Sequence, residues 1–98
     1  MAQEDIIKIK AEIYDIICQQ DEYVTSANTV QQEKNQKVQQ LKDYQRPEKN
    51  TSPDDIIKLK AEIFDIMLIQ EEYVAAANTL QQTKSQKLQQ LADAKKKQ

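Results

Sequence analysis

The sequence predicts an all-α protein that folds as an antiparallel hairpin of two long helices, with residues 1–98 forming a single helical domain. Three observations lead to this fold class: the chain has no glycine, its apolar residues recur at helical spacing, and one helical pattern occurs twice. Without glycine, turns that need a positive φ angle are scarce, which favours uninterrupted helices. A chain of this length builds only a modest core.

An internal duplication organises the chain. Residues 5–43 and 55–93 align at a constant offset of 50, with 26 identities in 39 positions. Some of the differences keep the character of the side chain, as in Tyr14 with Phe64. Such self-similarity is typical of a repeated structural unit. We therefore expect two helices of similar length with similar apolar surfaces.

The first copy predicts a helix over about residues 3–45. Its apolar residues step by three, four and seven positions, which places them on one helix face. A second row of apolar residues partly overlaps the first. The apolar face is therefore wider than contact with one partner helix requires, and each helix is expected to contact more than one neighbour. The expected core and interface residues are Ile6, Ile9, Ile13, Ile16, Ile17, Tyr23, Val24, Ala27, Val30, Val38 and Leu41.

The linker, residues 46–52, carries the strongest helix-breaking signals. Pro47 disfavours helical backbone at the residue before it, and Pro53 suits the first turn of a helix. Ser52 is a candidate N-cap, and the two aspartates after Pro53 favour the positive end of a helix dipole. A second helix is therefore predicted over about residues 53–96. Its expected core and interface residues are Ile56, Leu59, Ile63, Ile66, Met67, Leu68, Ile69, Tyr73, Val74, Ala77, Leu80, Leu88 and Leu91.

The length of the linker predicts that the helices run antiparallel. Each helix would be roughly 60 Å long at the rise of an α-helix. The stretch QRPEKNTSP between them, residues 45–53, spans only about 30 Å when fully extended, so it is too short to join two parallel helices in register. Charge agrees with this direction, because residues 4–23 carry a net charge of -4 and residues 74–98 carry +4.

The antiparallel register predicts particular contacts between lysines and carboxylates. A turn near residues 49 and 50 makes the numbers of facing residues sum to about 99. Exposed ion pairs contribute little individually, but this pattern penalises the wrong orientation. The register also sets Tyr23 against Ala76. The expected ion pairs are Lys84–Asp15, Lys87–Glu12, Lys95–Glu4, Lys34–Asp65 and Lys37–Glu62.

A two-helix hairpin shields little interior, so apolar surface remains for a further contact. In the second copy, Leu68 and Ile69 stand where the first copy has Cys18 and Gln19, and they extend the apolar surface next to Met67. We expect two hairpins to form a homodimer, as a four-helix bundle or coiled coil. Assemblies of three or four chains stay open as alternatives, as does a domain-swapped dimer.

Composition argues against catalytic chemistry. The chain has no histidine for a triad or a di-iron site, no glycine for a phosphate-binding loop, and the single Cys18 cannot form an internal disulfide or a zinc site. Glu12 and Asp15, like Glu62 and Asp65, lie one helical turn apart, yet their expected partners are lysines. We therefore expect no enzyme activity, no catalytic residue, no cofactor and no metal.

The composition also bears on location and partners. A formal net charge of -2 argues against a dedicated nucleic-acid binder. No apolar run approaches the ~18 residues of a membrane helix, and the start MAQEDIIK lacks the basic and apolar regions of a signal peptide. We expect a cytoplasmic protein without a membrane partner, which binds itself and another protein.

The run IIKLKAEIFDIMLIQEEYVAAANTLQQ resembles the short helical accessory proteins of tailed bacteriophages. In particular, KLKAEIFDI is similar to the opening of the tail-fibre assembly chaperones, which are small coiled-coil proteins that help fibre proteins to trimerise. The likeness covers nine residues well and about 25 loosely in each copy. It implies a phage protein that acts by binding, in the host cytoplasm.

Together these observations predict a non-enzymatic helical protein–protein interaction module, acting as an assembly or scaffolding factor or a chaperone. One alternative is a small nucleic-acid-associated or regulatory protein that uses Lys84, Lys87 and residues 95–97. Salt-dependent binding to DNA or RNA would distinguish it. A second alternative is a purely structural or engineered hairpin without a client.

Overall fold

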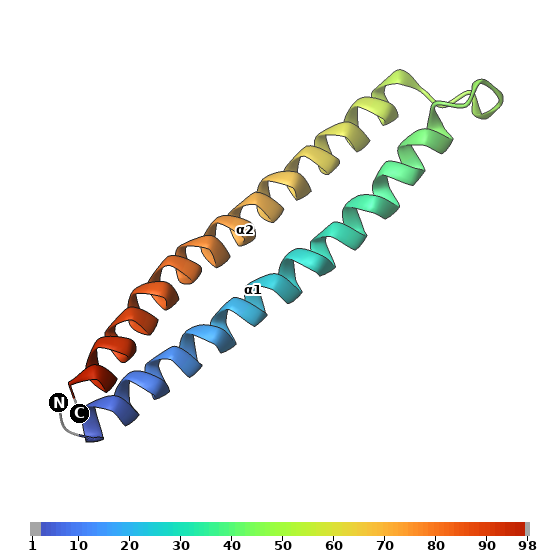
Figure 1. Cartoon of the computed structure of the whole chain (residues 1–98). Helices are drawn as coiled ribbons and strands as arrows, with labels where there is room; N and C mark the ends of the chain where they lie inside the picture. The colour runs from blue at the N-terminus through green and yellow to red at the C-terminus, as the bar shows by residue number, and fades with distance from the viewer. Residues whose placement is uncertain (1–2, 98) are drawn as a thin grey trace. The chain divides into compact units, whose positions relative to one another are not determined.

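The protein is an all-α helical hairpin, seen in a computed structural model that describes residues 3–97. Helix α1 comprises Gln3–Tyr44, a short 3-10 helix η1 comprises Pro47–Lys49, and helix α2 comprises Pro53–Lys96 (Figure 1). No β-strand occurs within the described range. The fold class agrees with the prediction from helical spacing and the internal repeat.

Both helices are long because their interiors contain neither glycine nor proline. The two prolines of the chain lie at the first residues of η1 and α2, where the fixed φ angle of proline is compatible with a helix start. Carboxylates occupy the first turns of α1 and α2, and lysines occupy their last turns. These charges complement the helix dipoles at both ends.

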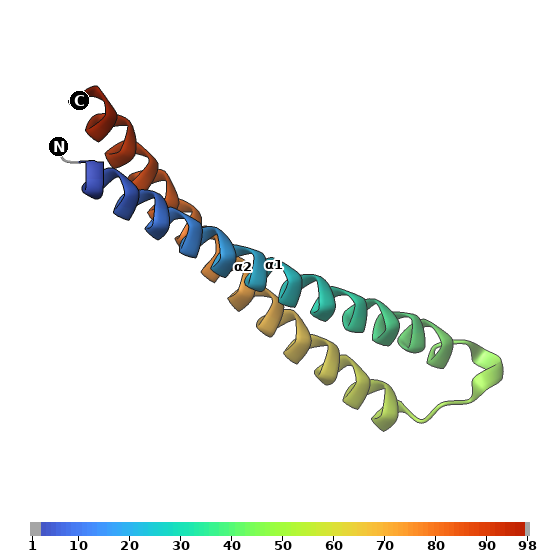
Figure 2. The ribbon, with the colours of Figure 1, turned by 90° about the horizontal axis from the view of Figure 1, so that it is seen from below.

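The connection between the helices makes its turn without glycine. After Pro47 opens η1, Asn50 adopts a φ angle of 50°, in the left-handed region, and its N–H donates to the Pro47 carbonyl at 3.3 Å. Asparagine is one of the few residues other than glycine that reach this region readily. Figure 2 shows the resulting loop between the end of α1 and the start of α2.

Side chains at the two ends of the loop hold the helix termini. The Asp55 N–H donates to Ser52 Oγ at 3.3 Å, as the predicted N-cap requires. At the end of α1, Asp43 forms ion pairs with Arg46 at 3.7 Å and with Lys49 at 3.6 Å. These contacts tie the loop to both of the helices that it joins.

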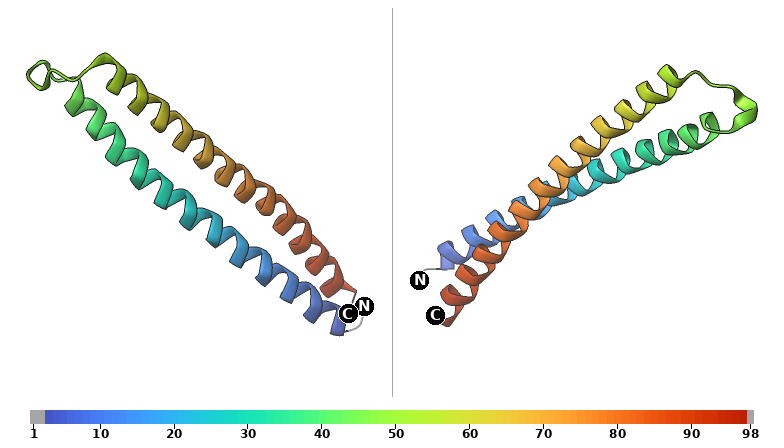
Figure 3. Two further views of the ribbon diagram at one scale, coloured as in Figure 1. Left: turned by 180° about the vertical axis from the view of Figure 1, so that it is seen from behind. Right: turned by 90° about the horizontal axis from the view of Figure 1, so that it is seen from above.

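The chain forms two compact units. Unit 1 comprises the residues up to Val24 with those from Val74 onward, and unit 2 comprises residues 25–73. In unit 1 the first half of α1 runs antiparallel to the second half of α2, and the two segments lie side by side in both views of Figure 3. In unit 2 the remaining halves of the helices are joined by the loop.

The internal repeat relates the two units to each other. At the offset of 50, residues 5–24 of unit 1 correspond to residues 55–74, and residues 74–93 correspond to residues 24–43. Each unit therefore combines the first half of one repeat with the second half of the other. The two units are two versions of one antiparallel helix pair, so their contacts can be compared position by position.

A line of aliphatic side chains forms the core of each unit. No polar or charged side chain is buried among the described residues. Along each helix run, the buried positions lie three, four or seven residues apart, as expected for the seam between two long helices. In unit 1 the buried side chains are Ile6, Ile13, Ile16 and Ala94, and in unit 2 they are Leu59, Ile63 and Ile66.

Candidate protein-interaction faces

An ion pair across the helix seam occurs at the same position in each unit. In unit 1, Lys87 Nζ lies 2.6 Å from Glu12 Oε2, and in unit 2, Lys37 Nζ lies 3.2 Å from Glu62 Oε2. The repeat makes these pairs equivalent, and both sets of residue numbers sum to 99. The predicted antiparallel register is therefore present in both units.

Glutamine pairs add a second repeated contact. Gln20 Nε2 donates to Gln81 Oε1 at 2.9 Å in unit 1, and Gln70 Nε2 donates to Gln31 Oε1 in unit 2. Gln20 and Gln70 follow the buried Ile13 and Ile63 by seven residues, so heptad spacing places them in the seam. Their partners, Gln31 and Gln81, lie in the polar second halves of the two repeats.

Three of the five ion pairs expected from the register do not form within the described range. Asp15 and Asp65 are exposed, whereas Lys34 and Lys84 are half-buried at seam positions. A carboxylate that points outward does not meet a lysine in the seam, even where their residue numbers sum to 99. The three pairs are Lys84–Asp15, Lys34–Asp65 and Lys95–Glu4.

Electrostatics at Glu12 favours its charged form. The side-chain hydrogen bond from Lys87 is the largest effect and lowers the pKa of Glu12. Desolvation opposes it, and attraction from Lys87 and Lys8 lowers the pKa further. Glu12 is therefore a hydrogen-bond acceptor in a structural pair. Among residues 3–97 there is also no cluster of three or more potential metal ligands.

The expected core and interface residues divide into three levels of burial. Six are buried, namely Ile6, Ile13, Ile16, Leu59, Ile63 and Ile66. Ten are half-buried, namely Ile9, Ala27, Val30, Val38, Leu41, Ile56, Tyr73, Ala77, Leu80 and Leu91. Eight are exposed, namely Ile17, Tyr23, Val24, Met67, Leu68, Ile69, Val74 and Leu88. The last group lies on surface that the hairpin leaves uncovered.

One buried residue lies outside the expected set. Ala94 is 1% exposed, and it lines a small hollow of unit 1 together with Ile9. It follows Leu80 by fourteen residues, so continuing the heptad spacing from Leu80 would have found it. The seam of unit 1 therefore reaches almost to the end of α2.

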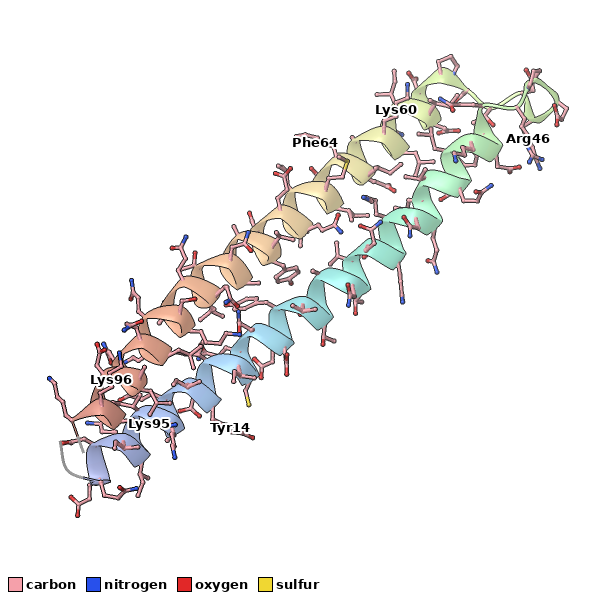
Figure 4. The ribbon with its side chains drawn as sticks, in the orientation of Figure 1. Tyr14, Arg46, Lys60, Phe64, Lys95 and Lys96 are labelled. Carbon is pink, nitrogen blue, oxygen red and sulfur yellow. The ribbon has the colours of Figure 1, made fainter. Side chains whose placement is uncertain are left out.

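Large apolar side chains form an exposed line along α1 in unit 1. Ile7 is 58% exposed and Tyr14 is 66% exposed, and Figure 4 shows Tyr14 projecting away from α2. Neither residue was in the expected set, although they are spaced by seven. We define the first outer stripe as Ile7, Lys10, Tyr14, Ile17, Asp21 and Val24.

The first outer stripe lies beside the seam. Ile7 directly follows Ile6, and Tyr14 directly follows Ile13. One residue turns an α-helix by about 100°, so these side chains point roughly at right angles to the buried ones. An α-helix with apolar surface in two adjacent directions can contact two neighbours at once. Among the described residues of unit 1, no element covers the stripe.

Unit 2 carries the equivalent surface on α2. Ile57 is 62% exposed and Phe64 is 58% exposed, and Figure 4 shows Phe64 projecting away from α1. Leu68 is exposed next to this line and widens it, whereas the exposed Ile69 lies on the opposite flank of the seam. We define the second outer stripe as Ile57, Lys60, Phe64, Met67 and Glu71.

Cys18 lies at the edge of the first outer stripe. It is half-buried and forms no disulfide, as a single cysteine requires. A side-chain hydrogen bond with Cys18 raises the pKa of Tyr14, and the nearby charge of Asp15 acts in the same direction. This shift favours the neutral form of the Tyr14 hydroxyl.

The fold and its exposed surfaces define an all-α helical hairpin with two equivalent apolar outer stripes. Comparison with known proteins finds no matching family model, no matching curated protein and no matching solved structure. Within residues 3–97, neither helix holds a segment both long and apolar enough to cross a bilayer.

Proposed function

We propose that this protein is a non-enzymatic helical interaction module, which acts as an assembly or scaffolding factor. The observation that carries the proposal is the alignment of exposed Ile7 and Tyr14 along one helix, repeated by Ile57 and Phe64 along the other. Single exposed apolar residues are common, but several aligned along one face of a helix mark a binding surface.

The spacing of the outer stripes favours a helical partner. Their positions recur at alternating intervals of three and four residues, which is the pattern of a coiled-coil seam. A partner helix with apolar residues at the same spacing would cover the line along its whole length. An assembly role in the cytoplasm is the form of this function that the resemblance to phage accessory proteins favours.

Basic residues support the nucleic-acid alternative less well. Lys87, one of the lysines considered for that role, bonds to Glu12 within unit 1. Residues 95–97 are exposed at the end of α2, where lysines also complement the helix dipole. The chain as a whole carries a formal net charge of -2. The nucleic-acid alternative also assigns no role to the two exposed outer stripes.

A capture experiment with stripe variants tests the proposal. The purified chain, coupled to beads, is exposed to a lysate of its source cells, and bound proteins are identified by mass spectrometry. The test variant carries Tyr14→Glu and Phe64→Glu. The control carries Gln36→Glu and Gln86→Glu, which add the same charge at exposed positions outside both stripes.

The two variants give opposite outcomes if the proposal is correct. Partners captured by the unchanged chain should be kept by the control and lost by the stripe variant. The far-ultraviolet circular dichroism of both variants should match that of the unchanged chain, because all four substituted residues are exposed. Capture of the same proteins by both variants would contradict the proposal.

A further inference from the structure

We propose that each outer stripe is covered by the same stripe of a second copy of this chain, running antiparallel. This inference rests on the proposed function, since it names the occupant of the surface described there. It is carried by the order of residues along the stripe. That order becomes self-complementary when one copy is reversed against another.

The first outer stripe determines the register of the contact. Pairing residues whose numbers sum to 31 sets Ile7 against Val24 and Tyr14 against Ile17 of the second copy. The twofold axis then passes between residues 15 and 16, and each contact occurs twice, as in any isologous interface. The paired segment, from residue 7 to residue 24, is about 26 Å long.

Charge selects the antiparallel direction. Lys10 and Asp21 are exposed, and neither forms an ion pair among the described residues. In the proposed register, Lys10 of each copy faces Asp21 of the other. A parallel, in-register contact would instead set lysine against lysine and aspartate against aspartate. Like charges placed face to face disfavour that arrangement strongly.

The second outer stripe shows the same order. Residues whose numbers sum to 131 set Phe64 against Met67 and Lys60 against Glu71 of the second copy. Glu71 replaces the aspartate of the first repeat without changing its charge. Neither Lys60 nor Glu71 forms an ion pair within residues 3–97. Both stripes therefore combine an apolar centre with charges of opposite sign at equal distances from it.

Self-complementarity distinguishes a second copy from an unrelated protein. An unrelated helix can bind the stripe even when the two ends of the stripe do not complement each other. An isologous contact requires that each end fit the other end after a twofold rotation. The pairing of Lys10 with Asp21 and of Ile7 with Val24 meets this condition.

Charge reversal on one stripe tests the inference in solution. The background chain carries Phe64→Glu, which places a charge in the centre of the second outer stripe so that only the first remains available. Molar mass is measured by size-exclusion chromatography with light scattering over a dilution series. We expect a mass of twice 11.4 kDa for this background.

Two single substitutions, tested separately and together, then test the proposed pairing of Lys10 with Asp21 of the second copy. Lys10→Glu sets carboxylates against carboxylates, and Asp21→Lys sets ammonium groups against ammonium groups, so each should raise the dimer Kd by about tenfold or more. A 1:1 mixture of the two variants should recover the dimer, as should one chain that carries both substitutions. Gln36→Glu on the same background is the control and should stay dimeric.

Clear outcomes overturn the inference. A background chain that stays monomeric with intact helices, or dimers that do not respond to Lys10→Glu and Asp21→Lys, would contradict it. If the unchanged chain is also monomeric, yet captures partners that the Tyr14→Glu, Phe64→Glu variant loses, this inference is overturned and the proposed function stands. Loss of both self-association and stripe-dependent capture would overturn both.

Discussion

Lys87 and Glu12 lie 75 residues apart in the sequence, yet their side chains form an ion pair of 2.6 Å in unit 1. The repeat places Lys37 and Glu62 in the same relationship in unit 2. Each pair reports the antiparallel register within its own unit. Sequence arithmetic alone predicted both pairs.

The pKa of Glu12 should depend on Lys87. We expect the side-chain carboxyl of Glu12 to titrate below the ordinary glutamate pKa in the folded chain, and to move back toward it in Lys87→Gln. Carbon-detected NMR titration measures this directly. Lys84→Gln is the control, because Lys84 forms no ion pair within the described range. An equal shift in both variants would contradict the assignment.

The same pair predicts a direction for the pH dependence of stability. A folded-state pKa below the unfolded-state value adds stability above the unfolded pKa, and this contribution is lost as the pH falls through the folded pKa. Acidification through that range should therefore destabilise the unchanged chain more than Lys87→Gln. Urea denaturation at a series of acidic pH values compares the two slopes.

Core truncations should have similar effects in the two units. Ile13→Ala in unit 1 and Ile63→Ala in unit 2 each remove a buried side chain at equivalent positions. Each should lower the free energy of unfolding by about 2–5 kcal/mol. Urea denaturation followed by circular dichroism at one fixed protein concentration measures the loss.

An exposed residue provides the control for these truncations. Gln39→Ala lies outside the seam and should change the free energy of unfolding by less than about 0.5 kcal/mol. A small effect of Ile13→Ala beside a large effect of Ile63→Ala would show that the two seams are not energetically equivalent, against the prediction from the repeat.

The left-handed conformation of Asn50 predicts which residues the loop accepts. Asn50→Gly should leave the stability nearly unchanged, because glycine adopts positive φ angles without steric cost. Asn50→Val should lower it by about 1–2 kcal/mol, because a β-branched side chain clashes in that region. Thermal and urea unfolding of the two variants are compared. Equal stability of the Asn50→Gly and Asn50→Val variants would mean that the loop takes another conformation in solution.

Disulfide trapping should distinguish a closed hairpin from a domain-swapped dimer. Tyr23 and Ala76 line the same hollow in unit 1, so cysteines at these positions should lie within reach of each other. In a Cys18→Ser background, oxidation of Tyr23→Cys with Ala76→Cys should give a crosslinked monomer on a non-reducing gel. Exclusively intermolecular crosslinks would indicate that the hairpin opens and exchanges its arms.

Local sequence signals were sufficient for the elements. Pro53 and Ser52 predicted the start of α2, and the absence of glycine predicted uninterrupted helices. The short linker and the opposite charges of the paired segments predicted the antiparallel direction. These inferences succeed because turn chemistry, caps and chain reach depend on neighbouring residues and on elementary geometry.

Assigning individual residues to the seam was less successful. Ile16 is buried and Ile17 is exposed, although both were expected at the core or an interface. Tyr14 was not expected at either, and it is one of the most exposed apolar residues of unit 1. Two adjacent stripes of similar character run along each helix, and spacing alone does not say which one meets the partner helix.

By itself, the sequence determined the two helices, their antiparallel direction and the repeat that makes unit 1 and unit 2 equivalent. Only the tertiary structure decided which stripe is buried, which lysines meet carboxylates, and that the first and second outer stripes stay uncovered. The physical reason is that helical periodicity is local, whereas burial depends on how one helix is rotated toward another. That rotation is set by contacts distant in the chain, such as Lys87 with Glu12.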